Sequence, residues 1–465
     1  MGGRERRGIM SKTHAGELSR FVAEARWDDV PARTVAKARR HVLDTLGAAL
    51  AGSVSTEARI ARAALSASGG AGSAPAWGTR ERLPPRDAAL ANGIAAHAFE
   101  LDDTGGCDHS GAVVLPAAIA ACALAPRAPD GREFLLAVIL GYDVGRRVLE
   151  AFGGYKPHNA AGWHSTGTCG VFGAAAAAAR ILGLDAIATR SALGIAASCA
   201  SGLWAFIHDG AMTKRLHAGR AAEGGLSAAI LAGAGMTGPA RVFDDAWGGF
   251  LKSHAHAPLD ADALVRDLGS SWRMDIAAIK PYASCRDTHS AVDAVGRILE
   301  REALAAEAIE RVEVRANDFL AGMVGGRDVA TLPAAQMSLP YAVSARLVLG
   351  SAGLSSYSEA CRSDARVLAM LERVVVVRDP GVQGSDRSSV AIHLRDGRRL
   401  EEATRTPLGA PTNPLADADL LAKFRELAGM ALAPHEAEAL ASRVLELDGC
   451  PDAGILASML VPGAA

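Results

Sequence analysis

The sequence is poor in aromatic residues, in net charge and in long apolar stretches. Phe, Trp and Tyr make up only 5% of the 465 residues, which disfavours an aromatic-rich sheet sandwich and favours packed helices. Lys and Arg total 49 against 51 Asp and Glu. This balance argues against nucleic-acid and membrane-surface partners, because both require a basic field. No window is long and charge-free enough to span a bilayer. The composition therefore predicts neither a nucleic-acid nor a membrane partner.

The seven cysteines are too scattered for a disulfide framework or a metal cluster. Their number is odd and no C-x-x-C pair occurs, which is typical of reduced thiols in the cytosol. The first residues, MGGRERRGIM, carry charges but lack the apolar stretch of a signal peptide. We therefore expect a cytoplasmic protein.

Several motifs of cofactor and metal enzymes are also missing. The sequence has no Walker A loop, no G-x-S-x-G elbow and no H-E-x-x-H zinc motif. Its G-x-G-x-x-G match, from Gly233 to Gly238, closes a predicted helix instead of following a strand. Carboxylates could hold Mg²⁺, but neighbouring Lys and Arg side chains would oppose a second cation. We predict neither a metal nor an organic cofactor.

Alanine and glycine are abundant, above all in GWHSTGTCGVFGAAAAAARILGLD, from Gly162 to Asp185. Ala favours helix but buries little area, so residues 173–179 predict a central helix that its neighbours approach closely on several sides. His164 precedes this helix, at the positive end where free N–H groups favour an anion. On this segment alone, a histidine that merely helps to cap the helix is the better explanation.

The pattern of the chain changes after about Ser270. Helical periodicity dominates residues 1–270, whereas later β-branched segments predict strands, and Asp396-Gly397 between two of them predicts a hairpin. Helices interleave with these strands, which is typical of an α+β domain. Beyond a Pro/Gly-rich linker, the last helices are expected to rejoin the first ones. The predicted fold is mainly α: a large all-helical domain from residues 1–270 and 406–465, with a smaller inserted α+β domain over residues 271–405.

Polar residues gather at four helix starts or bends. These groups are Glu100/Asp102/Asp103/Asp108/His109, then His164, then Lys214/His217/Arg220, and finally Lys280/Tyr282/Cys285/Arg286/His289. Singly, each has a structural explanation, because acidic bends cap helices and Lys or Arg is usually solvated. Together they predict one pocket, since burying several ionisable groups is costly unless they pair or meet a ligand. Histidines that move protons, beside cations that bind carboxylates, suit a small polycarboxylic acid.

Five ordered stretches resemble the MmgE/PrpD family, which includes 2-methylcitrate dehydratase, cis-aconitate decarboxylase and iminodisuccinate epimerase. They are ELDDTGGCDHSGAVVLP, GWHSTGTCGVFGAAAAAARILGL, DGAMTKRLHAGRAAEGG, KPYASCRDTH and AQMSLPYAV. The resemblance extends from about Ala15 to Leu447. It implies a homodimer, a lid formed by the inserted domain, and catalysis without metal or organic cofactor.

Taken with the charge pattern, the resemblance assigns a role to each candidate site residue. Catalytic roles fall to His109, His164, Lys214, Asp102 and His289, and substrate-binding roles to Asp103, Thr104, Thr213, Arg220, Lys280, Cys285, Arg286 and Tyr341. Two positions depart from the family pattern. Glu100 stands where some members have Asp, and Cys285 stands where the decarboxylase members have His. The second departure argues against decarboxylation, because a proton donor would be missing. His217 and Arg220 also have a structural alternative, in which either pairs with the acidic bend.

The reaction predicted first is dehydration of a 2-hydroxy polycarboxylate, as in a 2-methylcitrate dehydratase. A base such as His164 or His109 would take the α-proton while an acid protonates the departing hydroxyl group. Lys214 and Lys280 would bind carboxylates, and Asp102 or Asp103 would orient a histidine. The alternatives are an epimerase of a dicarboxylic acid, a cis-aconitate decarboxylase-like lyase and, from another class, a non-catalytic carboxylate-binding scaffold.

Overall fold

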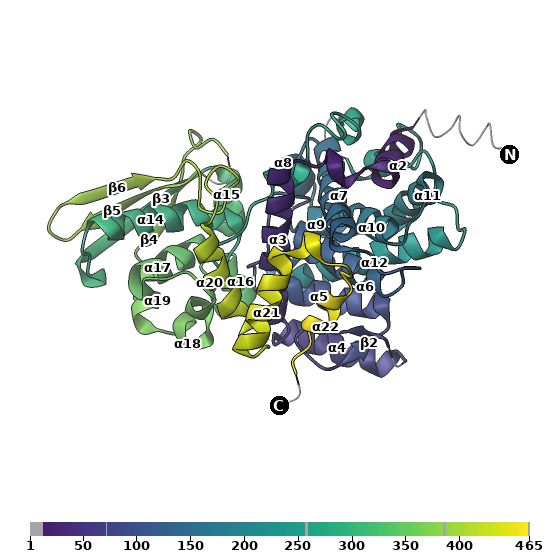
Figure 1. The fold of residues 1–465 in the computed structure, drawn as a ribbon. Coiled ribbons are helices and arrows are strands. Elements are labelled where there is room, and N and C mark those ends of the chain that lie inside the picture. The colour runs from purple at the N-terminus through teal and green to yellow at the C-terminus, as the bar shows by residue number, and fades with distance from the viewer. Residues whose placement is uncertain (1–12, 71, 256–258, 385–386, 464–465) are drawn as a thin grey trace.

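Two groups of secondary-structure elements lie side by side in the computed structural model, which describes residues 13–70, 72–255, 259–384 and 387–463 (Figure 1). One is a large helical body and the other a smaller α+β region, so the predicted mainly α fold is confirmed. The N-terminal stretch MGGRERRGIM, on which the signal-peptide expectation rested, lies outside the described residues. Within the described ranges, no helix combines the length and apolarity needed to cross a membrane.

The helical body is formed mainly by the first half of the chain. Its helices are α2 (His14–Glu24), α3 (Ala32–Gly52), α4 (Thr56–Ser68), α5 (Pro85–Ala96), α6 (Ser110–Cys122), α7 (Gly131–Ala151), α8 (Tyr155–Ala160), α9 (Ser165–Thr168), α10 (Gly170–Ile181), α11 (Ala186–Ala196), α12 (Thr213–Gly233) and α13 (Phe250–His254). A two-stranded antiparallel ribbon, β1 (Ala74–Pro75) and β2 (Arg82–Leu83), connects α4 to α5.

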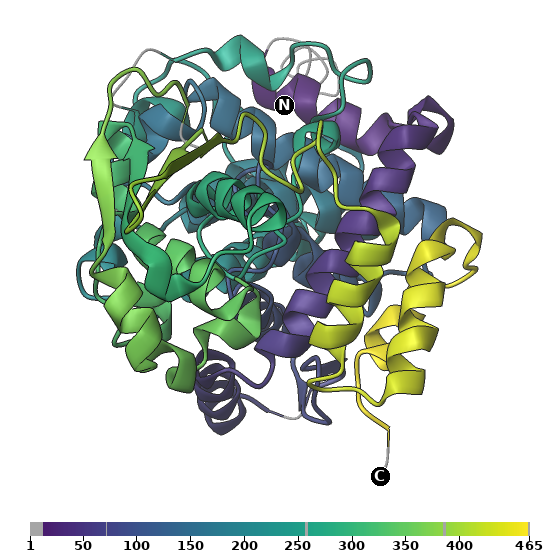
Figure 2. The ribbon, with the colours of Figure 1, turned by 90° about the vertical axis from the view of Figure 1, so that its left-hand side faces the viewer.

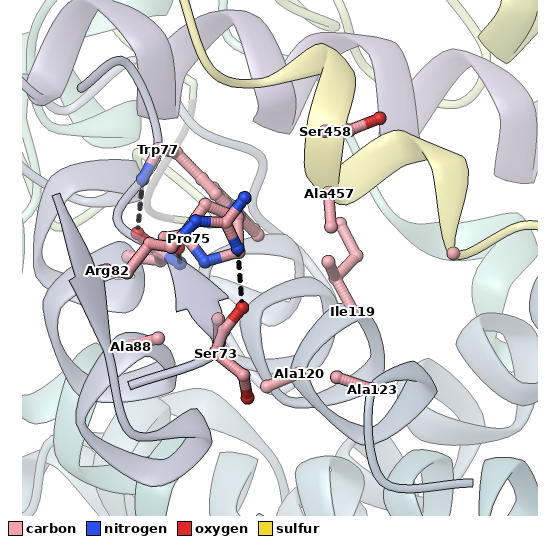
Figure 3. Close-up of a pocket in the computed structure, with 13 residues that line it drawn as sticks. Ser73, Pro75, Trp77, Arg82, Ala88, Ile119, Ala120, Ala123, Ala457 and Ser458 are labelled. Carbon is pink, nitrogen blue, oxygen red and sulfur yellow. Dashed lines mark hydrogen bonds between the residues drawn. The ribbon is translucent and has the colours of Figure 1, made fainter. Parts of the chain in front are cut away.

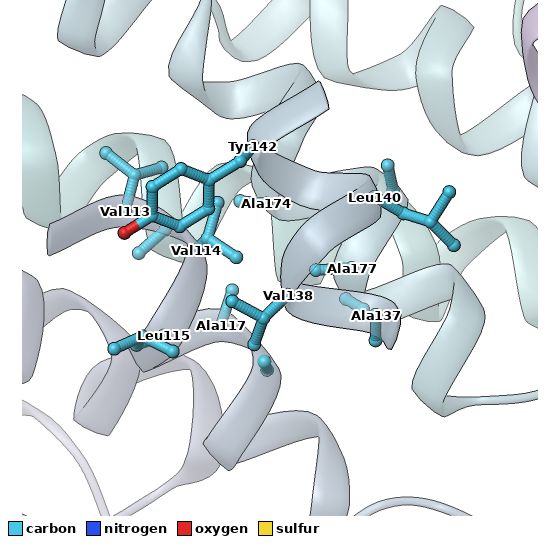
Figure 4. Packing of buried hydrophobic residues seen from close by; sticks show 14 of the residues in the cluster. Val113, Val114, Leu115, Ala117, Ala137, Val138, Leu140, Tyr142, Ala174 and Ala177 are labelled. Carbon is cyan, nitrogen blue, oxygen red and sulfur yellow. The ribbon is translucent and has the colours of Figure 1, made fainter. Parts of the chain in front are cut away.

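Helix α10 is the central helix of this body, as its Gly/Ala composition predicts. All its residues from Gly170 to Ala179 are buried, and it contacts α6, α7, α11 and α12. Glycine permits the close contact of α10 with α7, since a Cβ on Gly173 would lie 2.5 Å from the carbonyl oxygen of Gly141. Figure 4 shows small and branched side chains of α6, α7 and α10, among them Val113, Val138 and Ala177, packed into one layer.

The α+β region contains a four-stranded sheet in the order β4-β3-β5-β6. Its elements are α14 (His289–Arg301), β3 (Ile309–Ala316), α15 (Asp318–Val324), α16 (Leu332–Gln336), α17 (Leu339–Leu349), α18 (Glu359–Arg362), α19 (Ala365–Leu371), β4 (Val374–Arg378), β5 (Ser389–Leu394) and β6 (Arg399–Ala403). Strand β3 pairs in parallel with β4 and antiparallel with β5. The predicted hairpin is confirmed: β5 and β6 are antiparallel, and Gly397 adopts the left-handed φ of 88° that the turn requires.

The last helices, α20 (Asp417–Ala428), α21 (Pro434–Leu445) and α22 (Ile455–Met459), return to the helical body. Figure 2 shows α20 running along α3, and Phe424 belongs to the same hydrophobic core as Leu46. Lys423 of α20 donates to Asp44 Oδ1 at 2.6 Å and to the carbonyl oxygens of Leu101 and Lys280, each at 2.7 Å. Helix α20 therefore contacts two of the polar segments predicted to form the site.

Candidate active site

The acidic bend between α5 and α6 has an unusual backbone. Glu100 (φ 55°) and Asp108 (φ 113°) have positive φ values, which are costly for residues with a Cβ. Two backbone hydrogen bonds between Thr104 and Ala278, of 2.8 and 2.7 Å, join this bend to the segment that leads into Lys280. The bend is thus fixed against the start of the α+β region.

Glu100 is the centre of a buried ion cluster. Its carboxylate lies 2.6 Å from Lys214 Nζ and 3.2 Å from Lys280 Nζ, and 3.1 Å from the guanidinium of Arg215. All four side chains are at most 2% exposed. Burial by itself raises the pKa of Glu100, but Lys214, Lys280 and Arg215 lower it well below its ordinary value. The cluster unites residues from α12, the acidic bend and the α+β region.

Asp102 lies between two histidines. Its oxygens are 3.0 Å from Nδ1 of His97 and 2.9 Å from Nδ1 of His109. Burial lowers the pKa of His97 to about 3, although Asp102 opposes the shift. For His109, burial also lowers the pKa, but Asp108 and Asp102 outweigh it and raise the pKa above the ordinary value. Two imidazoles whose pKa values shift in opposite directions therefore share a carboxylate, with their rings 4.1 Å apart.

His164 is fully buried directly before α9, yet its side chain makes no capping hydrogen bond. Its Nδ1 lies 3.0 Å from Nδ1 of His217, and its Nε2 is 3.2 Å from the hydroxyl of Thr166 and 3.7 Å from Asp108. Burial, with His217 and Lys214, lowers the pKa of His164 well below its ordinary value. The capping explanation is therefore not the one that the structure shows: His164 is a neutral imidazole in a histidine cluster.

A cavity of about 270 Å³ opens beside these groups. Its lining combines the acidic bend, α7, the start of α12, and loops on both sides of the α+β region: Glu100, Thr104, Gly105, Gly106, Asp108, His109, Arg146, Leu149, Tyr155, Trp204, Lys214, Ile276, Ala278, Cys285, Arg286, Asp287, Ala410 and Pro411. Polar groups of opposite charge thus surround a space that fits a small molecule.

A second cavity, of about 160 Å³, lies between the β1–β2 ribbon and α22 (Figure 3). Arg82 donates to the carbonyl oxygen of Ser73 at 2.7 Å, and the backbone N–H of Trp77 donates to Asn92 at 2.9 Å. The residues that line it include no carboxylate and no histidine. This cavity therefore lacks the groups that proton transfer requires.

Most of the predicted catalytic residues converge at the larger cavity. Thr104, His109, Lys214, Cys285 and Arg286 line it directly. Asp102, His164 and Lys280 contact the lining residues His109, Asp108 and Glu100, respectively. His289 likewise contacts the lining residue Arg286, at 3.4 Å from its Nδ1. The structure thus brings nine of the predicted residues to one place.

Two predicted residues serve the interior instead. The carboxylate of Asp103 accepts from the Tyr142 hydroxyl at 2.5 Å and the Gly111 N–H at 2.9 Å, and lies 2.8 Å from His41 Nδ1. The hydroxyl of Tyr341 donates to the carbonyl oxygen of Ser356 at 2.7 Å. Both side chains are buried, and neither lines the cavity.

Three further predicted residues lie off the cavity lining. Thr213 is exposed at the start of α12, and Arg220 is exposed and pairs with Glu223 at 2.8 Å. His289 is buried behind Arg286, with its Nε2 3.2 Å from the carbonyl oxygen of Ser284. Burial, Arg286 and Lys280 lower the pKa of His289 well below its ordinary value.

Sequence reasoning missed several groups at the site. His97, Arg146, Tyr155, Trp204 and Arg215 belong to the cluster or the cavity wall. Helix geometry also separates two residues that the sequence grouped with Lys214. Residues three apart share a helix face, whereas six residues correspond to a rotation of about 240°, so His217 lies near the face of Lys214 and Arg220 does not. No such spacing marks His97, Arg146, Tyr155 or Trp204, because they come from separate segments.

Comparison with known proteins agrees with these features. The MmgE/PrpD N-terminal domain matches residues 16–260, and the MmgE/PrpD C-terminal domain matches residues 282–448. A cis-aconitate decarboxylase of Homo sapiens is 30% identical over 444 residues, covering 92% of this chain and 90% of its own. A cis-aconitate decarboxylase of Aspergillus terreus is 29% identical, covering 96% and 95%. A cis-aconitate decarboxylase-like protein of Aspergillus oryzae is 28% identical, covering 96% of each chain. The chain belongs to the MmgE/PrpD family.

Proposed function

We propose that this protein is a cofactor-independent lyase that removes one carboxyl group, as CO₂, from a small unsaturated tricarboxylic acid such as cis-aconitate. Relatives that cover nearly the whole chain carry the name cis-aconitate decarboxylase. This reading replaces dehydration, the reaction predicted first from the sequence, as the favoured function.

The observation that carries the proposal is the position of His109, which is the single imidazole among the cavity-lining residues and has Asp102 2.9 Å from its Nδ1. His109 lines the cavity and has a raised pKa, whereas the neutral rings of His97 and His164 lie behind it. Decarboxylation needs one proton donor and no base, because CO₂ leaves the electron pair of the broken C–C bond on the substrate. Dehydration and epimerisation each need a base at the substrate as well. A lining carboxylate such as Asp108, 3.7 Å from Nε2 of His109, would have to take that role.

The cavity also presents cations for the carboxylates that stay on the substrate. Lys214, Arg146 and Arg286 contribute to its wall. Arg146 donates to the carbonyl oxygen of Gly105 at 3.2 Å, and Arg286 to that of Leu408 at 2.7 Å. Arg146 also pairs with Glu150 at 3.0 Å, and Arg286 also donates to the carbonyl oxygen of Pro407 at 3.2 Å. These contacts hold two positive guanidinium groups at the cavity wall, where they would attract a substrate carboxylate.

The proposed step conserves atoms and electrons. The bond between the departing carboxylate carbon and its neighbour breaks, and its electron pair forms a new double bond to the next carbon. The π pair of the original double bond moves to the far carbon, where it accepts a proton. His109 Nε2 then gives its proton to the far carbon of that system, forming the new C–H bond. Asp102, at 2.9 Å from Nδ1, stabilises the imidazolium before the transfer. In this role His109 replaces the donor that Cys285 does not supply, because burial raises the pKa of that thiol to about 12.

The direct test is incubation with cis-aconitate, citrate, 2-methylcitrate and dicarboxylates in deuterated water, followed by NMR and CO₂ detection. We expect CO₂ and one deuterium on the new C–H carbon of the product. Water loss from a hydroxy acid would support the dehydratase, and exchange without other change would support the epimerase. Thermal stabilisation by these acids without turnover would support the scaffold.

A variant pair tests the proton donor. His109→Gln should lower kcat by about 10²–10⁴-fold, the usual worth of one general acid, with the fold retained. His393→Gln is the matched control, because His393 is part of β5 in the α+β region and does not line the cavity. Near-normal turnover in His109→Gln would remove His109 from the mechanism.

The homodimer and the cytoplasmic location stay predictions. Light scattering of the purified chain and fractionation of the source cells would test them.

A further inference from the structure

We propose that His97, His109 and His164 form a binding site for a divalent cation of the zinc class, and that an ion bound there blocks turnover. The site itself is argued from the geometry of the three histidines. The inhibition rests on the function proposed above.

The three rings offer nitrogen ligands at a suitable spacing. One ring nitrogen of each residue lies within 4.8 Å of one from each of the others, and all three side chains are buried. In tetrahedral zinc sites, Zn–N distances of about 2.0–2.1 Å place ligand nitrogens roughly 3.3 Å apart. Closing on an ion therefore requires side-chain shifts of about an ångström, without rearrangement of the backbone.

One ring nitrogen of the cluster residues is buried without a hydrogen-bond partner among the described residues. Nε2 of His97 accepts no hydrogen bond from any described residue, and its nearest ion-pair neighbour is Glu100 at 3.9 Å. A buried acceptor without a partner destabilises the fold, because it has lost its bonds to water. A metal ion at this nitrogen would remove that cost.

Asp102 orients two of the ligands as metal sites usually require. Its carboxylate bonds Nδ1 of His97 at 3.0 Å and lies 2.9 Å from Nδ1 of His109, which also bonds the carbonyl oxygen of Asp103 at 2.9 Å. These contacts engage Nδ1 of both rings and leave Nε2 as the ligand atom. Metal-bound histidines commonly donate their second N–H to a carboxylate in this way. One carboxylate thus fixes the metal-binding tautomer of two rings.

Asp108 supplies the charge and an oxygen ligand. Its carboxylate is 3.7 Å from Nε2 of His109 and 3.7 Å from Nε2 of His164. With Asp102, it brings two negative charges to the cluster, enough to balance a divalent ion. Lys214 and Lys280, the cations expected from the sequence to oppose a metal, are both held on Glu100. The two ammonium groups repel a bound cation and so weaken its binding, but they do not fill the space between the histidines.

The consequence for activity follows from the nitrogen that the ion takes. An ion on Nε2 of His109 displaces the proton that this atom would deliver to the substrate. Binding of the ion and turnover are therefore mutually exclusive, which would make the cluster an inhibitory site.

Direct metal binding tests the site without substrate. Metal-free protein titrated with CoCl₂ should take up one ion per chain and show the intense visible bands of tetrahedral cobalt, and ZnCl₂ should displace it. X-ray absorption of the zinc-loaded wild type should show three imidazole ligands, a readout that needs no variant.

Variants separate this cluster from other histidines. His97→Gln, checked for folding by circular dichroism, should lose the cobalt bands. His14→Gln should keep them, although His14 lies beside Asp244 and Asp262 on the surface and is a rival ligand set. Bands that persist in His97→Gln but vanish in His14→Gln, or the absence of binding to wild type, would overturn the site.

Activity is measured in a separate arm. Zinc loading should lower the turnover of cis-aconitate at least tenfold relative to the metal-free enzyme. Removal of zinc by a chelator should restore it. Unchanged turnover at full occupancy would overturn the inhibition. If the metal-free enzyme does not turn over any acid of the panel, the proposed function fails while the binding result stands.

Discussion

Replacing Glu100 with Gln removes the carboxylate of the buried ion cluster while keeping nearly the same shape. Lys214, Arg215 and Lys280 lie 2.6, 3.1 and 3.2 Å from this carboxylate. Arg215 retains a hydrogen bond to Gln336 at 2.9 Å, whereas both lysines lose their carboxylate partner. The variant therefore leaves buried ammonium groups without compensation.

Two independent arguments give the expected loss in the free energy of unfolding. Breaking a buried ion pair by removing one partner costs about 3–5 kcal/mol. Alternatively, one lysine loses its proton, and lowering its pKa from about 10.4 to 7 costs about 4.6 kcal/mol at 1.36 kcal/mol per unit. Both arguments agree, so the Glu100→Gln substitution should lower the free energy of unfolding by about 3–5 kcal/mol at pH 7.

Thermal and urea unfolding of Glu100→Gln and wild type would measure this loss. Glu438→Gln is the control, because Glu438 pairs with Arg425 on the surface, where both side chains are half exposed. We expect no measurable change in stability for the control.

The pH dependence gives a second readout. The pKa of Glu100 is depressed in the fold, so its stabilisation is complete above the ordinary pKa of Glu and is lost as pH falls toward the folded value. Wild type and Glu100→Gln should therefore converge in stability in acid. Equal unfolding curves for both proteins at pH 7 would refute the ion cluster as a stabilising element.

Three further substitutions test the site and the core. Asp102→Asn removes a group that raises the pKa of His109, so the fall of kcat/KM at alkaline pH should move to lower pH; an unmoved profile would exclude His109 as the titrating acid. Gly225→Ala puts a methyl group 2.4 Å from the Cβ of Ala174, at the contact of α12 with α10, and should destabilise the protein by about 1–3 kcal/mol. Gly322→Ala in α15, where no atom lies within 4 Å of the added methyl group, should not destabilise the protein. Equal melting temperatures for the two variants would contradict the close packing of α12 against α10. The Cys285 thiol, whose pKa burial raises to about 12, should resist iodoacetamide at pH 7, and Cys285→Ser should stay active; rapid labelling found by mass spectrometry would show a thiolate.

Local features of this protein follow from its sequence alone. The Gly/Ala run predicts a helix in close contact because residues without bulk leave little else to fill the space around it, and α10 confirms this. Asp396-Gly397 predicts the β5–β6 turn because Gly adopts a positive φ at little cost. Both features depend on residues close together in the sequence, so they can be predicted without knowledge of the tertiary structure.

The composition of the site was decided by tertiary packing. His97, His109 and His164 are separated by up to 67 positions, and only the folding of α5, α6 and α9 onto one another brings their rings together. Asp102 and Asp103 are adjacent in sequence, yet one contacts His109 and the other is held by Tyr142 of α7. Neighbouring side chains in a tight bend point in different directions, so residue type alone did not separate the two roles.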